Sequence, residues 1–210
     1  MKAIILISEA SLPLAKTLQR ELPDTLIYTK NECEGCISIT SCHRFIEEHF
    51  NDFDSIIFIG AMGICVRSIA GCIKNKYKDP AVVCVDSTGR FVISVLSGHV
   101  GGANELTRHI AAITGGEAVI TTQSDNAGLW ALDTLAGKYG WKITVPHAKM
   151  NRLVTLFVNR EPTALLLDIK DKGTEYLERT LPAHVKVFYH FEDMPQIGIQ
   201  VDYCCYTLYI

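Results

Sequence analysis

Short, continuously apolar runs alternate with amphipathic stretches along the first 140 residues, and this alternation limits the possible folds more than any other feature. The apolar runs are long enough for strands but too short for helices, which predicts strands buried on both faces. They are AIILIS (3–8), TLIYT (25–29), SIIFIG (55–60), PAVVCVD (80–86), RFVISVL (90–96) and EAVIT (117–121). The stretches with helical periodicity are 11–21, 39–50, 103–114 and 126–140, with a further short helix near Met62.

This order predicts an α/β fold in which a mostly parallel sheet lies between two layers of helices, a three-layer αβα domain. The crossovers of such a sheet are right-handed, and its ligands bind beyond the carboxyl ends of the strands. Strands 80–86 and 90–96 have no crossover helix between them, because the short DSTGR turn joins them directly.

The pattern changes after Gly140, where a linker with Pro146 precedes less regular sequence. We expect an N-terminal domain over 1–140 and a smaller α/β central unit over 141–195, with strands at 163–168 and 185–190. The end of the chain, 196–210, includes the strand-like run YCCYTLYI. It is expected to lead toward a C-terminal domain that this chain lacks.

Composition excludes several classes of protein. Hydrophobic residues make up 48% of the 210 residues, which allows a substantial core, and the net charge is −3. A general nucleic-acid surface normally carries a basic excess, so we expect no nucleic-acid partner. No tract approaches the roughly 18 apolar residues of a membrane span. The start, MKAIILISEAS, reaches Glu9 too early for a signal peptide and predicts a first strand, so we place the chain in the cytoplasm.

The eight cysteines include a C-x2-C-x5-C-H series formed by Cys33, Cys36, Cys42 and His43. This series is compatible with a zinc or iron–sulfur ligand set. No second ligand pair follows at a suitable distance, which favours a cysteine-rich loop without a metal. The cysteines in apolar surroundings are expected to be reduced thiols that pack as small hydrophobic groups.

Three strand-to-helix corners carry the chemically interesting residues: GAMGICVRSIAG (60–71), LSGHVGGANELTRHIAA (96–112) and TTQSDNAG (121–128). Glycines allow close approach of the backbone to a ligand, and helix N-termini attract anions. The nucleotide patterns G-x-G-x-x-G and G-x4-G-K-[ST] are both absent. Because an α/β sheet places its ligands beyond the strand ends, the three corners together predict an anion site.

The second corner also holds a candidate base. His99 lies between glycines, two residues after Ser97, so the pair is a possible base and nucleophile. Asp125, from the third corner, is the obvious acid to orient them. A lone histidine is more often a hydrogen-bonded structural residue, and that alternative remains open. Glu105 is spaced to pair with Arg108 or His109 on the same helix.

Four blocks, in this order, resemble one family: GAMGICVRSIAG, KYKDPAVVCVD, GRFVISVLSGHVGGANELTRHIA and AVITTQSD. They are similar to the N-terminal part of the CbiG proteins, the cobalt-precorrin-5A hydrolases of anaerobic cobalamin biosynthesis. The resemblance covers about residues 54–138, and 141–195 is more loosely similar to the family's central region. The Cys33–Cys42 segment departs from the family pattern, as does Gly71, where proline is more usual.

The resemblance implies a reaction in which water opens the ring-A δ-lactone of cobalt-precorrin-5A and acetaldehyde is released, giving cobalt-precorrin-5B. The cobalt belongs to the substrate, so no cofactor or protein-bound metal is expected. The expected partners are this tetrapyrrole, the absent C-terminal domain and a precorrin methyltransferase, which some members carry in the same chain.

Such a reaction needs a base for water and donors for the developing oxyanion. We expect His99, Asp125 and Ser97 to be catalytic, with the N–H groups of Gly101 and Gly102 as oxyanion donors. The residues expected to bind substrate are Gly60, Met62, Gly63, Arg67, Gly98, Gly101, Gly102, Asn104, Glu105, Thr121 and Thr122.

Three alternatives stay open. The first is a non-catalytic tetrapyrrole-binding module of a larger protein. The second is a metal or redox module built on the Cys33–His43 series, and the third and weakest is a nucleotide-binding domain.

Overall fold

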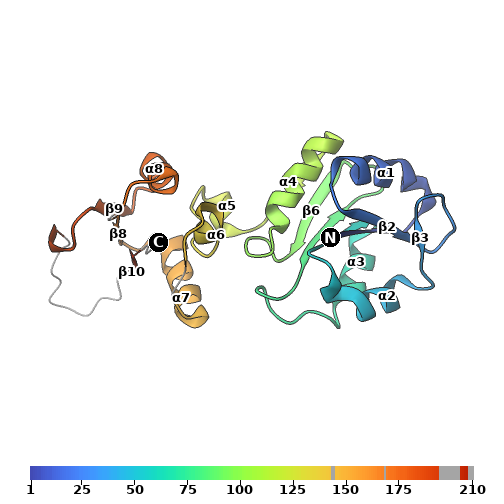
Figure 1. Cartoon of the computed structure of the whole chain (residues 1–210), viewed down its shortest axis with the longest axis horizontal. Helices are drawn as coiled ribbons and strands as arrows, with labels where there is room; N and C mark the ends of the chain where they lie inside the picture. Colours follow the sequence, from blue (N-terminus) through green and yellow to red (C-terminus); the bar gives the residue numbers. More distant parts are fainter. Residues whose placement is uncertain (143–144, 168, 194–203, 208–210) are drawn as a thin grey trace. The chain divides into compact units, whose positions relative to one another are not determined.

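The computed structural model describes residues 1–142, 145–167, 169–193 and 204–207, and the chain forms two compact units, Met1–Thr122 and Gln123–Ile210 (Figure 1). The boundary between the units lies after Thr122, whereas the sequence analysis placed it after residue 140. The reason is that Trp130, Leu132 and Leu135 are buried in the core of the second unit. The segment after Thr122 supplies part of that core.

The first unit is built on a seven-stranded sheet with the order β3-β2-β1-β4-β5-β6-β7. The strands β1 to β5 are mutually parallel, β6 is antiparallel to β5, and β7 is parallel to β6. The strands are β1 (Lys2–Leu6), β2 (Thr25–Thr29), β3 (Ile37–Ser38), β4 (Ser55–Ile59), β5 (Ala81–Val85), β6 (Phe91–Leu96) and β7 (Glu117–Val119). The predicted mostly parallel sheet is confirmed.

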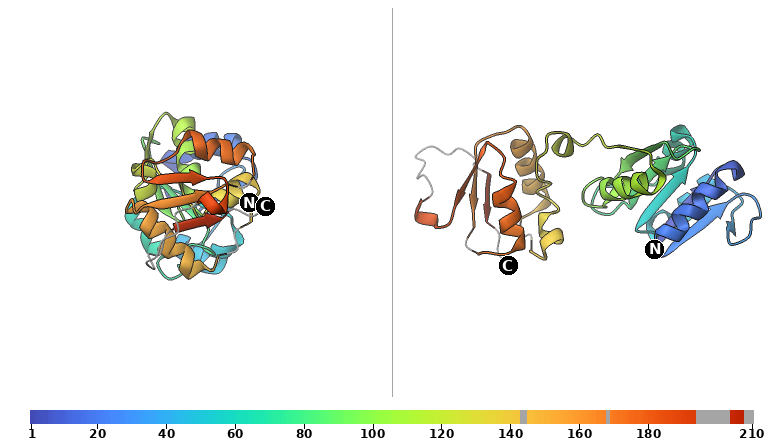
Figure 2. Two further views of the ribbon diagram at one scale, coloured as in Figure 1. Left: turned by 90° about the vertical axis from the view of Figure 1, so that its left-hand side faces the viewer. Right: turned by 90° about the horizontal axis from the view of Figure 1, so that it is seen from above.

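Helices cover both faces of this sheet. They are α1 (Leu12–Glu21), α2 (Cys42–His49), α3 (Met62–Ile69) and α4 (Ala103–Thr114), with short 3-10 helices η1 (Glu9–Ser11) and η2 (Phe50–Asp52). The helices α1 and α4 pack on one face and α2 and α3 on the other (Figure 1). Seen from above, α1 and α4 lie in front of the sheet (Figure 2). The three-layer αβα prediction is confirmed.

The central strand β1 shows why continuously apolar runs form this sheet. Side chains alternate across a strand. Accordingly Ile4 and Leu6 belong to the core under α1 and α4, whereas Ala3 and Ile5 belong to the core under α2 and α3. All four side chains are at most 3% exposed. A strand covered on both faces needs apolar residues at every position, and AIIL supplies them.

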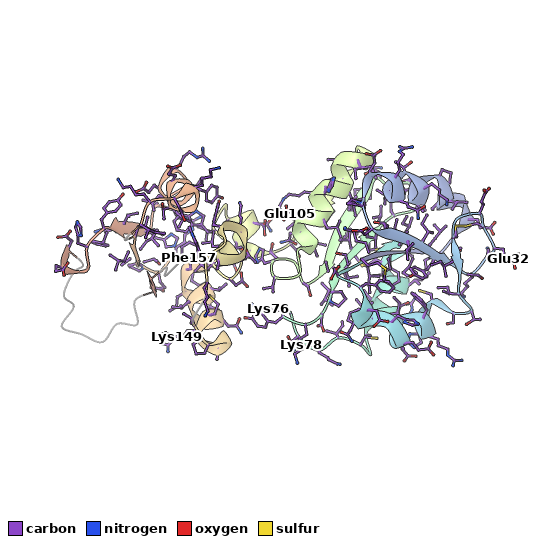
Figure 3. All side chains as sticks on the ribbon, in the orientation of Figure 1. Glu32, Lys76, Lys78, Glu105, Lys149 and Phe157 are labelled. Carbon is purple, nitrogen blue, oxygen red and sulfur yellow. A yellow bond between two sulfur atoms is a disulfide. The ribbon has the colours of Figure 1, made fainter. Side chains whose placement is uncertain are left out.

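The reversal of β6 determines which loops can share a site. We call the end of the sheet where β1, β2, β4 and β5 finish the carboxyl end, and the end where they start the amino end. Leu96, at the end of β6, pairs with Val82 near the start of β5. The loops after β6 and β7 therefore lie at the amino end, as do Lys76 and Lys78, while Glu32, after β2, lies at the carboxyl end (Figure 3). The prediction that all three corners share one end of the sheet is wrong.

The second unit contains a parallel sheet with the order β10-β8-β9 among its described residues. Its elements are α5 (Gln123–Asn126), α6 (Leu135–Tyr139), α7 (His147–Val158), β8 (Thr163–Leu166), α8 (Lys172–Arg179), β9 (Val185–Phe188), η3 (Phe191–Asp193) and β10 (Cys204–Thr207). The predicted helix over 126–140 is wrong, because only α5 and α6 are helical there. A strand was also predicted at the end of the chain, and there β10 pairs with β8. Residues 196–203 and 208–210 of the predicted C-terminal segment lie outside the described residues.

Two tryptophans join distant segments of the second unit. The Trp130 indole N–H donates to the Thr180 hydroxyl at 2.9 Å, and the Trp141 N–H donates to the Asp171 carboxylate at 2.7 Å. Asp171 also caps the N-terminus of α8 by accepting from the Gly173 and Thr174 N–H groups.

In the part of the chain that the structure describes, no helix is long and apolar enough to cross a membrane.

Candidate functional site

The loop Ser97–Gly102 joins β6 to α4 at the amino end of the sheet. Ser97 is buried and has a φ of 57°, a left-handed conformation that is uncommon for a residue other than glycine. Its hydroxyl donates to the Asp79 carbonyl at 2.9 Å, which ties the loop to the segment before β5. The proton of the predicted nucleophile is therefore directed at a carbonyl and not at His99.

The start of α4 satisfies its own backbone donors. The Gly102 N–H donates to the His99 carbonyl at 3.0 Å, the Ala103 N–H to Ser97 and the Asn104 N–H to Gly98. Three N–H groups that a helix N-terminus usually offers to a capping group or an anion are thus already used. The Gly102 N–H is occupied in this structure, and its predicted oxyanion role stays a prediction. The φ of 82° at Gly102 gives the glycine a conformational purpose.

Asn104 organises the polar interior beneath this loop. Its side chain is 3% exposed in total, accepts from the Ser94 hydroxyl at 2.7 Å and donates to the Thr122 hydroxyl at 3.0 Å. A Cβ at Gly98 would lie 2.8 Å from the Asn104 carbonyl oxygen, so a side chain at position 98 would displace it. The structure brings these three predicted binding residues together, with Asn104 and Thr122 in a network that fixes the shape of the loop.

The other predicted residues of this end are partly or fully accessible. His99 is half-buried within the loop, and Glu105 is exposed on the first turn of α4 (Figure 3). Thr121 is exposed just after β7, and Gly101 approaches Ser97 closely, since a Cβ there would lie 2.5 Å from the Ser97 Cβ. Asp125 belongs to α5, in the second unit. Its pairing with His99 stays a prediction.

The first corner lies at the opposite, carboxyl end. Gly60 follows β4 with a φ of 153°, and a Cβ there would lie 2.9 Å from the Ile7 side chain. The helix α3 begins after Ala61, which has no side-chain group to cap it, and Met62 and Gly63 form its first turn. The exposed Arg67 guanidinium reaches back over Gly63, 3.4 Å from the position of a Cβ there. Gly60, Met62, Gly63 and Arg67 therefore form a group separate from the His99 loop.

A small pocket also lies at the carboxyl end, between the ends of β1 and β2 and helix α3. It has a volume of about 130 Å³ and is lined by Leu6, Ile7, Lys30, Ile39, Cys42 and Ile64. The sheet order changes direction at β1, whose neighbours are β2 and β4, and α/β folds bind ligands at such a switch point. The sequence reasoning assigned no role to Lys30 or Ile39, although the switch-point rule, applied to the correct strand order, would have indicated this place.

The cysteine series that suggested a metal site has a different arrangement. Cys33 and Cys36 form a disulfide, and His43 faces Glu47 one turn along α2, at 3.5 Å. Cys42 is a buried thiol whose sulfur lies 3.7 Å from the Ser68 hydroxyl oxygen, and burial raises its pKa. Within the described residues, no group of three or more His, Cys, Asp or Glu side chains is arranged to hold a metal ion.

Two family models match the chain in succession. The model described as Cobalamin synthesis G N-terminal matches residues 44–125, and the model described as Cobalamin biosynthesis central region matches residues 130–208. The chain belongs to the CbiG family. The N-terminal CbiG match includes both the Gly60 corner and the His99 loop, and it begins after the disulfide loop.

Curated CbiG relatives carry an enzyme name. The chain is 36% identical over 168 residues to a protein of Salmonella typhimurium named cobalt-precorrin-5A hydrolase, covering 79% of this chain and 48% of the relative. It is 32% identical over 194 residues to a protein of Priestia megaterium with the same name, covering 89% of this chain and 52% of the relative. The chain thus spans about half the length of these relatives.

A solved structure shares the fold. The crystal structure of a cobalamin biosynthesis protein G homolog from Sulfolobus solfataricus aligns with 88% of this chain and 52% of its own, with a TM-score of 0.51 and 22% identity. At that identity the likeness concerns the fold alone.

Proposed function

We propose that the chain is part of a cobalt-precorrin-5A hydrolase, which uses water to open the ring-A δ-lactone of its substrate and releases acetaldehyde, leaving cobalt-precorrin-5B. The observation that carries this proposal is the 36% identity over 168 residues to a protein with that name. The cobalt is part of the substrate, and the proposal gives the protein no metal of its own.

The amino end of the first unit is the place we propose for the chemistry. A strand of five residues, such as β4, separates the two ends of the sheet by about 16 Å. One lactone carbonyl therefore cannot meet both His99 and Arg67. The amino end has the imidazole of His99 in a loop whose shape is fixed by the Ser97–Asp79 bond and by Asn104.

In this proposal the His99 imidazole accepts a proton from the water that attacks the lactone carbonyl. Gly101 N–H remains our candidate donor to the oxyanion, since Gly102 is already bonded. The Ser94–Asn104–Thr122 network acts by positioning, because it holds Gly98 and thereby the backbone on which His99 sits. Arg67 and the neighbouring pocket have no part in the reacting site.

The test is a comparison of two histidine variants in the full-length protein. We expect His99→Gln to lower kcat for acetaldehyde release by about 100-fold or more, the usual contribution of a positioned base. His109→Gln, on the exposed face of α4, is the matched control and is expected to change kcat less than about twofold. Acetaldehyde is measured with a coupled dehydrogenase. Turnover of His99→Gln at the control's level would contradict the role of His99.

A second candidate is a tetrapyrrole-binding module without activity of its own. It is favoured by the chain covering only 48% and 52% of the two curated relatives. The two are distinguished by giving cobalt-precorrin-5A to this chain alone and following both its absorbance and acetaldehyde. A spectral change without acetaldehyde would support the binding module, whereas acetaldehyde release would support the hydrolase.

A further inference from the structure

The loop between β2 and β3 contains a disulfide bond that has no part in the proposed reaction. Parallel neighbours are usually joined by a dozen or more residues, but Lys30–Cys36 alone connects these two strands. The chain turns back at Gly35, which has a φ of 69°, and the Cys33–Cys36 disulfide closes the turn. The Cys36 N–H also donates to the Cys33 carbonyl at 3.1 Å.

One side chain from outside the loop assists the disulfide. The Lys16 ammonium group, on α1, donates to the carbonyls of Glu34 at 2.9 Å and Gly35 at 3.2 Å. Both bonds are near the surface, where a hydrogen bond contributes little net stability. The disulfide is therefore the main restraint on this turn.

The two ends of the loop are walls of the pocket at the carboxyl end. Lys30 precedes the turn and Ile39 follows it, and both line the pocket with Cys42. Ile39 is held by its N–H, which donates to the Thr29 carbonyl at 2.8 Å, immediately after the two pairs that attach β3 to β2. A strand of two residues at the edge of a sheet is weakly held, so loosening the turn would release this wall.

The disulfide is accessible to reagents while the thiols of the core are not. Cys33 and Cys36 are partly exposed, and Glu32, Glu34 and Gly35 around them are exposed. By contrast, Cys42, Cys65 and Cys84 are 7%, 0% and 1% exposed. The loop also precedes the N-terminal CbiG match, which begins at residue 44.

We propose that Cys33 and Cys36 form a reversible dithiol–disulfide site, and that its oxidised state holds the wall of the pocket closed. The reaction partner is a dithiol. One thiolate of the dithiol attacks a sulfur of the Cys33–Cys36 bond, and its second thiol resolves the mixed disulfide. Two electrons and two protons pass to the protein, which gains two thiols, and the dithiol becomes a disulfide. The proposal is independent of the reaction at the amino end.

The experiment uses Cys42 as a reporter of the pocket wall. The full chain is oxidised with diamide, a two-electron oxidant of dithiols, or reduced with dithiothreitol, desalted, and labelled with N-ethylmaleimide for increasing times. Peptide mass spectrometry then follows each cysteine separately. We expect Cys33 and Cys36 to be linked after oxidation and labelled after reduction. Cys42 should label about tenfold faster in the reduced protein, while Cys65 and Cys84 stay protected in both, because only the edge of the unit opens.

Two variants keep the result interpretable. Cys33→Ser with Cys36→Ser should give the fast Cys42 rate in both buffers, whereas Cys72→Ser, a half-buried thiol outside the loop, should keep the redox dependence. Three outcomes would overturn the proposal: no Cys33–Cys36 link under oxidation, one Cys42 rate in both states, or joint exposure of Cys42, Cys65 and Cys84. The last would mean that the disulfide supports the whole unit.

Discussion

Two threonines of α4 differ in whether their side-chain hydroxyl groups have hydrogen-bond partners. The Thr107 side chain is completely buried, and its hydroxyl has no hydrogen-bond partner among the described residues. Thr114, two turns later, donates its hydroxyl proton to the Ala111 carbonyl and accepts from the Gly116 N–H at 3.2 Å. A buried hydroxyl without a partner loses its bonds to water and gains none in return.

Substitution by valine should therefore have opposite effects at the two positions. Thr107→Val replaces the hydroxyl with a methyl group of similar size and is expected to raise the free energy of unfolding by about 1 kcal/mol. Thr114→Val removes two bonds and is expected to lower it by about 1 kcal/mol. Urea unfolding followed by circular dichroism measures both. A loss of stability in Thr107→Val would show that the hydroxyl has a partner in solution.

At this scale the sequence indicated the order of strand, turn and helix better than it indicated the backbone conformation of the turn. The pattern of 96–112 correctly predicted the end of a strand, a turn and a helix. It could not indicate that Ser97 takes a left-handed conformation, which directs carbonyls at the N–H groups of Ala103 and Asn104. Lys30 and Ile39 were missed because only the pairing of β2 with β3 brings them to one pocket.

Whole elements were predicted well in type and less well in direction. Apolar runs identified β1, β2, β4, β5, β6 and β7. The central strands β1, β4 and β5 are buried along nearly their whole length and leave almost no position for a polar side chain, whereas β6 and β7 are only partly covered. The hairpin of β5 and β6 was also predicted. Its consequence, that the corner after β6 lies at the amino end, follows only when the strand order is known. The helix expected over 126–140 is interrupted because Trp130 and Leu132 pack into the core between α5 and α6.

Two helical glycines in the second unit provide a test of packing. A Cβ at Gly173, in α8, would lie 2.1 Å from the Trp141 ring, whereas a Cβ at Gly137, in α6, would meet nothing within 4 Å. Gly173→Ala is expected to destabilise the unit by about 3 kcal/mol through overpacking. Gly137→Ala, the control, is expected to stabilise it by about 0.5–1 kcal/mol, since alanine favours helix. Urea midpoints from tryptophan fluorescence give both values, and equal midpoints would contradict the packing.

The molecule as a whole has separate cores in its two units, and its two tryptophans both lie in the second. Tryptophan fluorescence therefore reports on that unit alone.

The second unit also contains a histidine, His184, whose pKa is lowered. Burial, and then the charge of Arg160, lower the pKa of His184 from its usual 6.5, against a hydrogen bond with the Phe157 backbone. Its ring packs on Phe157, with 4.9 Å between centroids.

This lowered pKa predicts a loss of stability in mild acid. Below about pH 6.5 the unfolded chain binds a proton at His184 that the folded unit binds less well, so the stability of the second unit falls until the pH reaches the lower folded pKa. The fluorescence-detected urea midpoint should decrease between about pH 7 and pH 5. His184→Gln should remove part of that slope, and His190→Gln, which is exposed, should retain it. Identical slopes in all three proteins would exclude His184 as the cause.

The short turn between β5 and β6 decides at which end of the sheet the His99 loop lies. Asp86 accepts from the Phe91 N–H at 2.6 Å and from the Thr88 N–H at 3.1 Å, and Gly89 takes a φ of 76°, so the chain reverses within a few residues. Without this reversal the His99 loop would open beside Arg67. One tight turn therefore places the candidate residues of the His99 loop at the amino end of the sheet, opposite Arg67. The two ends of one sheet, about 16 Å apart, are thereby separate surfaces, and a substitution at one end leaves the geometry of the other unchanged.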